Sequence, residues 1–247
     1  MTRINHRHLA TRTFFGTAFS LATTAAFAFG TINSVGQHAE HEKITRLGLS
    51  SFGIGPKTMS EIAGENGHFG AVGAPDWRLI TQKSAHCDAG DHLDLPGYPQ
   101  SNADALKPLS ACRKWIFDKL KEAVADAGAI TGKSGAIDGS QIPTLISCKY
   151  TGAKGRAKCN VLEDLGLAFH TAQDFYSHTN WVDRPDAKAA IGPDNPPGLD
   201  QTARAPWIVR ARMLRHPPAL SAAALASSPR TMPAATATAR SASCIRC

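Results

Sequence analysis

Several common signatures are missing from this chain of 247 residues, and each absence argues against a class of protein. No G-x-S-x-G motif occurs, which argues against a serine lipase. The sequence HAEHE is not H-E-x-x-H, so no zincin is implied. GAITGKS is one residue short of a phosphate-binding loop, so no ATP site is expected. Strand-like alternation is scarce and no internal repeat is visible, which leaves a mainly helical domain.

Lysine and glutamate are absent from residue 199 onward, where the chain has seven Arg and one Asp among Ala, Pro, Ser and Thr. Residues 29–198 carry a net charge of −2, so the overall +7 arises at the two ends. Because a nucleic-acid footprint should lie on the folded domain, this charge does not indicate nucleic-acid binding. We treat 199–247 as a separate tail, either naturally disordered or the product of a GC-rich gene read out of frame.

The first 28 residues have the order of a secretory signal. Arg3, Arg7 and Arg12 precede the apolar run TFFGTAFSLATTAAFAFG, and residues 26–28 form a small-x-small cleavage pattern. The run is short for a membrane span, and no other long apolar run follows. We therefore predict cleavage near Ala28, which leaves a domain over 29–198 in a secreted or periplasmic protein. The alternative for the first 28 residues is an amphipathic or buried N-terminal helix.

Six cysteines are present, and disulfides are the default in an exported protein. Cys148 and Cys159 flank the loop KYTGAKGRAK, which a disulfide would close. Cys87 with Cys112 would then form the second pair, although four cysteines allow three pairings. The CxxC at the end of the tail is only half of a metal-binding motif and is set aside.

Helical periodicity dominates residues 29–198. PLSACRKWIFDKLKEAVADAGAI has apolar side chains at helical spacing, with Pro108 near its start and Gly128 at its end. CNVLEDLGLAFHTAQDFYSH predicts a second helix, and AEHEKITRLGL a third, shorter one. The apolar stripe of the second helix consists of Val161, Leu162, Leu165, Phe169 and Ala172. We expect an all-α domain with long Gly- and Pro-rich loops of the kind that often carry function.

The second predicted helix holds three potential metal ligands, His170, Asp174 and His178, each four residues from the next. Four residues advance a helix by about 400°, so these side chains form one narrow stripe. A solvated helix face has the same spacing. Two features favour a metal: the neighbouring residues are bulky and apolar, and further candidate ligands, His41, Asp76 and His86, lie far upstream.

The segments AEHEKIT, APDWRLIT, SAHCDAGDHLDLPGYPQS, GRAKCNVLEDLGLAFHTAQDFYSHTNW and DNPPGL together resemble CinY-type and Het-C-type proteins, which are similar to zinc-dependent phospholipases C and single-strand-specific nucleases. The resemblance covers roughly residues 38–199 and implies an all-helical fold with up to three zinc ions. The metal ligands it implies are His41, Asp76, His86, His170, Asp174 and His178. It also implies that Asp174 bridges two ions and that Asp76 orients or deprotonates the attacking water.

The chain departs from that family at two places. The relatives bind zinc through the amine and carbonyl of an N-terminal Trp, but here no Trp precedes His41 and cleavage after Ala28 leaves about a dozen residues ahead of it, with His38 as a substitute. The relatives also supply a His and a carboxylate downstream of the signature, whereas the only histidine after His178 is His216, in the tail. We therefore expect one or two zinc ions and weak or absent activity.

The function we predict is phospholipase C-type hydrolysis of a phospholipid at a membrane surface. Zinc lowers the pKa of a bound water to about 7, which supplies hydroxide for in-line attack on phosphorus. A secreted single-strand nuclease is the alternative on the same scaffold, and it is less favoured because residues 29–198 are net negative. The rival from another class is a non-catalytic interaction or recognition protein, and the sequence does not identify a protein partner for it.

Overall fold

The computed structural model describes residues 29–34, 37–65, 68–90, 101–132, 135–190, 195 and 198–209. Within these ranges the chain is helical and forms no strand, which confirms the all-α class. None of the described helices is long and apolar enough to cross a membrane. The predicted signal at 1–28 and the part of the predicted tail beyond 209, with His216 and its CxxC, lie outside the described residues. The beginning of that tail, 199–209, is described and belongs with the domain, because Ala205 and Ile208 are buried in a cluster with side chains of α5 and α6.

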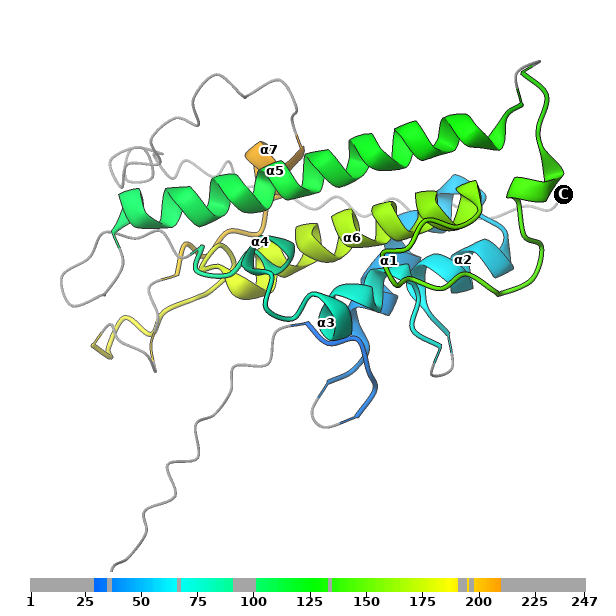
Figure 1. Cartoon of the computed structure of the whole chain (residues 1–247). Helices are drawn as coiled ribbons and strands as arrows, with labels where there is room; N and C mark the ends of the chain where they lie inside the picture. The colour runs from blue at the N-terminus through cyan, green and yellow to red at the C-terminus, as the bar shows by residue number, and fades with distance from the viewer. Residues whose placement is uncertain are drawn as a thin grey trace, which may run out of the picture.

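The molecule is arranged around one central helix. The α-helices are α1 Glu40–Leu49, α2 Pro56–Ala63, α3 Ala74–Arg78, α4 Lys83–His86, α5 Asn102–Ala127, α6 Ala157–His178 and α7 Pro206–Val209. The 3-10 helices are η1 Ser50–Phe52, η2 Ala71–Gly73, η3 Gly128–Ile130 and η4 Gly139–Gln141. In Figure 1 the long helices α5 and α6 run side by side, and α1, α2 and α3 lie on the other side of α6. Helix α6 is therefore covered from several directions.

The three helices expected from periodicity are present as α1, α5 and α6, but α5 begins earlier than predicted. Its N-cap is Ser101, whose hydroxyl accepts a hydrogen bond from the backbone N–H of Asp104, as serine does at a helix start. Pro108 consequently lies inside the helix, where it lacks the N–H of a regular helical turn. Helices α2, α3 and α4 were not predicted, because each is too short to show a full apolar period.

The burial of α6 differs from the sequence prediction. Val161, Leu165 and Phe169 of the predicted apolar stripe are only partly buried. His170 and Asp174, which belong to the polar stripe, are 0% and 1% exposed. The polar stripe is thus an interior face, because α1, α3 and α4 pack around it and exclude water.

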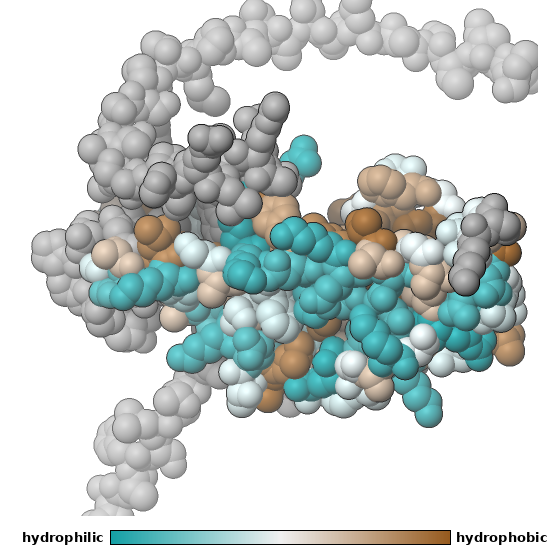
Figure 2. Space-filling view, turned by 45° about the horizontal axis from the view of Figure 1, so that its top comes forward, coloured by the Kyte–Doolittle hydropathy of each residue, from teal (hydrophilic) through white to brown (hydrophobic). Residues whose placement is uncertain are grey.

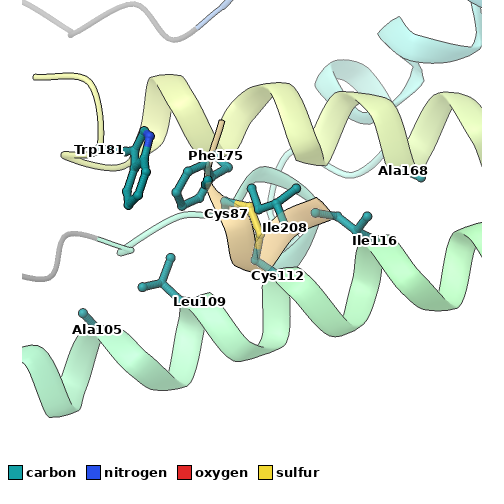
Figure 3. Packing of buried hydrophobic residues seen from close by; sticks show 10 residues of the cluster. Cys87, Ala105, Leu109, Cys112, Ile116, Ala168, Phe175, Trp181 and Ile208 are labelled. Atoms are coloured by element: carbon teal, nitrogen blue, oxygen red, sulfur yellow. A yellow bond between two sulfur atoms is a disulfide. The ribbon is translucent and has the colours of Figure 1, made fainter. Parts of the chain in front are cut away.

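One hydrophobic cluster joins α5 to α6 and contains a disulfide. Figure 3 shows Leu109 and Ile116 of α5 facing Phe175 of α6, with the bridge between Cys87 and Cys112 among them. The Cα atoms of the bridged cysteines are 4.9 Å apart. This confirms one of the two predicted pairs, and it ties the segment after α4 to the middle of α5.

A second cluster packs α2 against α6 and the loop that precedes it, and Cys148 and Cys159 form a disulfide there. The carboxylate of Glu61, on α2, accepts hydrogen bonds from the backbone N–H of Cys148 at 3.2 Å and from the Tyr150 hydroxyl at 2.8 Å. Both disulfides are typical of an oxidising compartment. Outside these clusters the surface is mixed, and Figure 2 shows a face dominated by hydrophilic residues with smaller hydrophobic areas.

Candidate metal centre

Asp174 lies at the centre of a buried group of imidazoles. Its Oδ2 is 2.9 Å from Nε2 of His170 and 2.9 Å from Nδ1 of His86. Its Oδ1 is 3.3 Å from Nε2 of His41. The two oxygens therefore face different histidines, which come from α6, α4 and α1.

Asp76, in α3, completes the group on its solvent side. Its Oδ1 is 3.4 Å from Nε2 of His170, and its other oxygen accepts a hydrogen bond from the Thr31 hydroxyl. The Asp76 side chain is 32% exposed, in contrast to the buried Asp174. The atoms form two overlapping sets that could hold a metal ion: His41, His170 and Asp174, and Asp76, His86 and His170.

A glycine in α6 allows the backbone of η2 to pack closely against α6 beside this site. A Cβ at Gly166 would lie 2.4 Å from the carbonyl carbon of Ala71, so only glycine admits the backbone of η2 at this distance. The neighbouring carbonyl of Val72 then accepts a hydrogen bond from Nδ1 of His170 at 2.8 Å. The close contact between η2 and α6 thereby sets the orientation of the His170 ring.

Two interactions hold the segment that carries His86. The Thr171 hydroxyl donates to the carbonyl of Ala85 at 2.7 Å, which joins α6 to α4 directly beside His170. The disulfide at Cys87 anchors the next residue to α5. The His86 ring is fixed by its own Nε2, which lies 3.2 Å from the carbonyl oxygen of Leu79.

His41 is held by a pair of polar side chains from α1 and α6. Its Nδ1 lies 2.7 Å from Oε1 of Gln173, and the Gln173 amide donates to the Thr45 hydroxyl at 2.9 Å. The Thr45 hydroxyl thus holds the Gln173 side chain against His41. The His41 ring also stacks on the His170 ring, with centroids 4.1 Å apart, and the ring of Phe29 meets it edge-on at 6.2 Å.

The outward hydrogen bonds determine where the imidazole protons lie. Each histidine has one nitrogen against an oxygen that only accepts: Val72 O for His170, Leu79 O for His86 and Gln173 Oε1 for His41. Those nitrogens must carry hydrogen. In the neutral rings the inward nitrogens are therefore lone pairs, and they face two carboxylates and one another, with Nε2 of His170 only 3.1 Å from Nδ1 of His86. Acceptors that converge in this way attract positive charge, as a metal ion or as protons on the imidazoles.

The charge balance of the site agrees with this attraction of positive charge. Burial acts to lower the pKa of His41 and of His86, but the hydrogen bond and the charge of Asp174 outweigh it and raise both pKa values. Burial lowers the pKa of His170, and the charge of His41 adds to that effect. Burial acts to raise the pKa of Asp174, yet the three imidazoles lower it well below its usual range. The carboxylate thus attracts positive charge, which protons or a metal ion can supply.

His178 lies at the edge of the group and has a different partner. Its Nε2 is 3.8 Å from Oδ1 of Asp174, which exceeds a direct contact. Its Nδ1 is 2.6 Å from Oδ1 of Asp88. His178 therefore follows the four-residue spacing on α6 but does not join either potential ligand set.

A cleft of about 520 Å³ opens onto the solvent side of the cluster. Asp76, His86 and His178 line it, together with the exposed aromatic side chains of Phe69 and Trp77. No Lys or Arg is among the residues that line the cleft in the described part of the chain. A substrate there would meet carboxylate, imidazole and aromatic groups.

Five of the six predicted ligands thus converge, and the sixth, His178, lies next to the group without belonging to either ligand set. The supporting residues Gln173, Thr45 and Gly166 had no signal in the sequence, because each acts through a contact between segments distant along the chain. His38, the suggested substitute near the N-terminus, is exposed and points its backbone N–H at Glu40. In comparisons with protein-family models, curated proteins and solved structures, nothing matches this chain.

Proposed function

We propose that this chain is an exported zinc-dependent phosphodiesterase domain that hydrolyses a phospholipid in the manner of a phospholipase C. The observation that supports it best is the convergence of three imidazoles and two carboxylates, in which the inward nitrogens are lone pairs when the rings are neutral. The family resemblance of the signature around His170 supplies the reaction class. The two disulfides support export.

The distances among the donor atoms suit zinc. Two nitrogen or oxygen ligands about 2.1 Å from a tetrahedral zinc are about 3.4 Å apart. The observed separations between His170, His86 and the two carboxylates run from 2.9 to 3.4 Å. Small outward shifts of the side chains would therefore accommodate the ion, and imidazole with carboxylate is a donor set that zinc commonly takes.

Asp174 would bridge two ions. Its Oδ2 faces His86 and His170, whereas its Oδ1 faces His41. One ion would be held by Asp76, His86, His170 and Asp174, and the second by His41 and Asp174. The distance from His178 to Asp174 supports one or two ions rather than three.

Asp76 would act on the water that attacks phosphorus. It is the most exposed carboxylate of the cluster and it lines the cleft, so it can accept a proton from a water molecule there. The Thr31 hydroxyl holds its other oxygen and fixes the carboxylate plane. Bound zinc would lower the pKa of that water and offset the charge that develops on the phosphoryl oxygens.

Signal cleavage after Ala28 would create an amino terminus beside this site. The ring of Phe29 lies against His41, and the carbonyl of Gly30 accepts from the backbone N–H of His41 at 3.3 Å. In the family that the sequence resembles, the mature N-terminus contributes to zinc binding. The segment at 29–30 is thus a better candidate for this role than His38.

A single-strand nuclease is the second candidate. Phe69 and Trp77, which are 45% and 55% exposed at the cleft, are positioned as stacking surfaces for bases. Against this, no basic side chain lines the cleft among the described residues, and a nucleic-acid backbone requires such charge. Phospholipid is therefore the substrate that the cleft favours.

The test combines metal content with two substrates. Zinc is measured by elemental analysis, and hydrolysis of phosphatidylcholine and of single-stranded DNA is followed with and without a chelator. Lipid cleavage that the chelator abolishes is expected. Cleavage of DNA alone would support the nuclease, and less than one equivalent of zinc without activity would support a non-catalytic protein. His170→Ala should lose zinc, whereas the control His68→Ala, outside the cluster, should keep it.

A further inference from the structure

A second hollow lies near the metal centre, and its lining includes Gln173, which binds His41. It has a volume of about 560 Å³ and lies between α1 and α6, with Ile44 and Gly48 on one side and Phe169 and Ala172 on the other. Phe29 lines both this groove and the metal cleft. A ligand that starts in the cleft can therefore extend over Phe29 into the groove.

The lining of the groove offers almost no polar chemistry. None of the described residues that line it is charged. The polar side chains of Thr45 and Gln173 are already engaged with each other, and Gln173 also binds His41. The Tyr176 hydroxyl accepts a hydrogen bond from the backbone N–H of Ala205 at 3.1 Å. A base or sugar would lose its hydrogen bonds to water in this groove, whereas a hydrocarbon chain would lose none.

We infer that the groove between α1 and α6 binds an alkyl chain of the lipid whose phosphate lies in the metal cleft. The inference rests on the proposed function, since it names the part of the substrate beyond the phosphodiester. The volume of the groove lies within the range of small-molecule sites. Phe29 lines both the groove and the metal cleft and so connects the two. The uncharged lining excludes the phosphates of a nucleic-acid strand as the occupant.

Gly48 provides a variant that fills the groove without disturbing the fold. A Cβ at this position would have no heavy atom within 4 Å, so a larger side chain has room. The residue is also inside α1, where leucine is a better helix former than glycine. Gly48→Leu should therefore fold and occupy space that the alkyl chain needs.

A matched pair on the same helix separates the groove from general surface effects. Ile44 lines the groove and is 37% exposed, whereas Leu47 is 78% exposed and is not part of the lining. Ile44→Asp places a charge at the groove. Leu47→Asp places the same charge on α1 away from it and serves as the control.

The experiment measures the binding of monomeric alkylphosphocholines with six, eight and ten carbons, by titration calorimetry below their micellar concentrations. Kd should fall about fourfold for each methylene that becomes buried. Gly48→Leu and Ile44→Asp should each weaken binding of the ten-carbon probe by at least about tenfold, and Leu47→Asp should match the wild type. Titrations in chelator measure binding of the alkyl chain without zinc. They therefore test the groove even if the chain proves not to be a phosphodiesterase.

Three outcomes would overturn the inference. The first is a Kd that does not depend on chain length. The second is equal binding of the ten-carbon probe by the wild type and Gly48→Leu. The third is self-association of the wild type, seen by sedimentation and lost in Gly48→Leu, which would assign the groove to a second copy of the chain.

Discussion

Asp174→Asn is expected to change stability in opposite directions with and without zinc. In the metal-free protein at pH 8, the inward nitrogens of the three histidines surround the buried charge of the Asp174 carboxylate. An asparagine amide would remove the buried charge, and its NH2 group could donate to two of those nitrogens. We expect Asp174→Asn to keep or raise the melting temperature in chelator, and to lose most of the stabilisation by zinc.

The size of the effect follows from linkage. Free zinc at 100 times its Kd stabilises the folded wild type by about 2.7 kcal/mol. In a domain of this size about 1 kcal/mol shifts the melting temperature by about 2–4 °C, so zinc should raise it by about 5–11 °C. Asp174 faces both ligand sets, and a loss of about 100-fold in affinity is expected when it is replaced. At the same zinc concentration about 0.4 kcal/mol would remain, or less than about 2 °C.

The assay is thermal unfolding followed by circular dichroism, in zinc and in chelator, with His68→Ala as the control. The His68 side chain is 37% exposed and lies outside both ligand sets, so its variant should respond to zinc like the wild type. If Asp174→Asn were destabilised equally in both buffers, the carboxylate would be a structural partner of charged histidines. The metal assignment would then be wrong.

Three more predictions test the surroundings of the site. Gly166→Ala forces a Cβ against the backbone of η2 and should lower the free energy of unfolding by about 1–3 kcal/mol, measured by urea denaturation. An unchanged value would contradict the close approach. Removal of the disulfide between Cys87 and Cys112 should weaken zinc binding in calorimetry, whereas removal of the one between Cys148 and Cys159 should not. Equal effects of the two removals would show that the disulfide between Cys87 and Cys112 does not position the metal site. The rise in melting temperature with zinc should shrink from pH 8 to pH 6, because two histidines have a pKa raised by the central carboxylate. Protonation of these histidines stabilises the metal-free form below their pKa, and this stabilisation is lost as pH rises through that pKa. A zinc-induced increase in melting temperature that did not depend on pH would show that protons and zinc do not compete.

Much of the local structure was predictable because it depends on neighbours along the chain. The spacing of His170 and Asp174 places them on one face of any α-helix, and α6 has the predicted form. The loop between Cys148 and Cys159 is short enough that their pairing could be anticipated, and the structure confirms it. The start of α5 was wrong by several residues, since Ser101 was not recognised as its cap.

The metal centre itself depended on contacts that no local pattern contains. Whether the stripe on α6 faced water or protein was undecided in the sequence, because both faces of the helix carry plausible interior residues. The amide of Gln173 and the carbonyl of Val72 orient their histidines from 132 and 98 residues away along the chain. The partnership of His178 with Asp88 likewise spans 90 residues.

The sequence by itself determined the three longest described helices, the ligand types and their step along α6, because backbone hydrogen bonding sets a helical period without reference to the rest of the chain. The tertiary structure alone decided that this polar face is buried, which nitrogen of each histidine points inward, and that an apolar groove adjoins the cleft. These features arise where α1, η2, α3 and α4 pack against α6. Such packing depends on the shape and volume of side chains distant along the chain, and no local period encodes it.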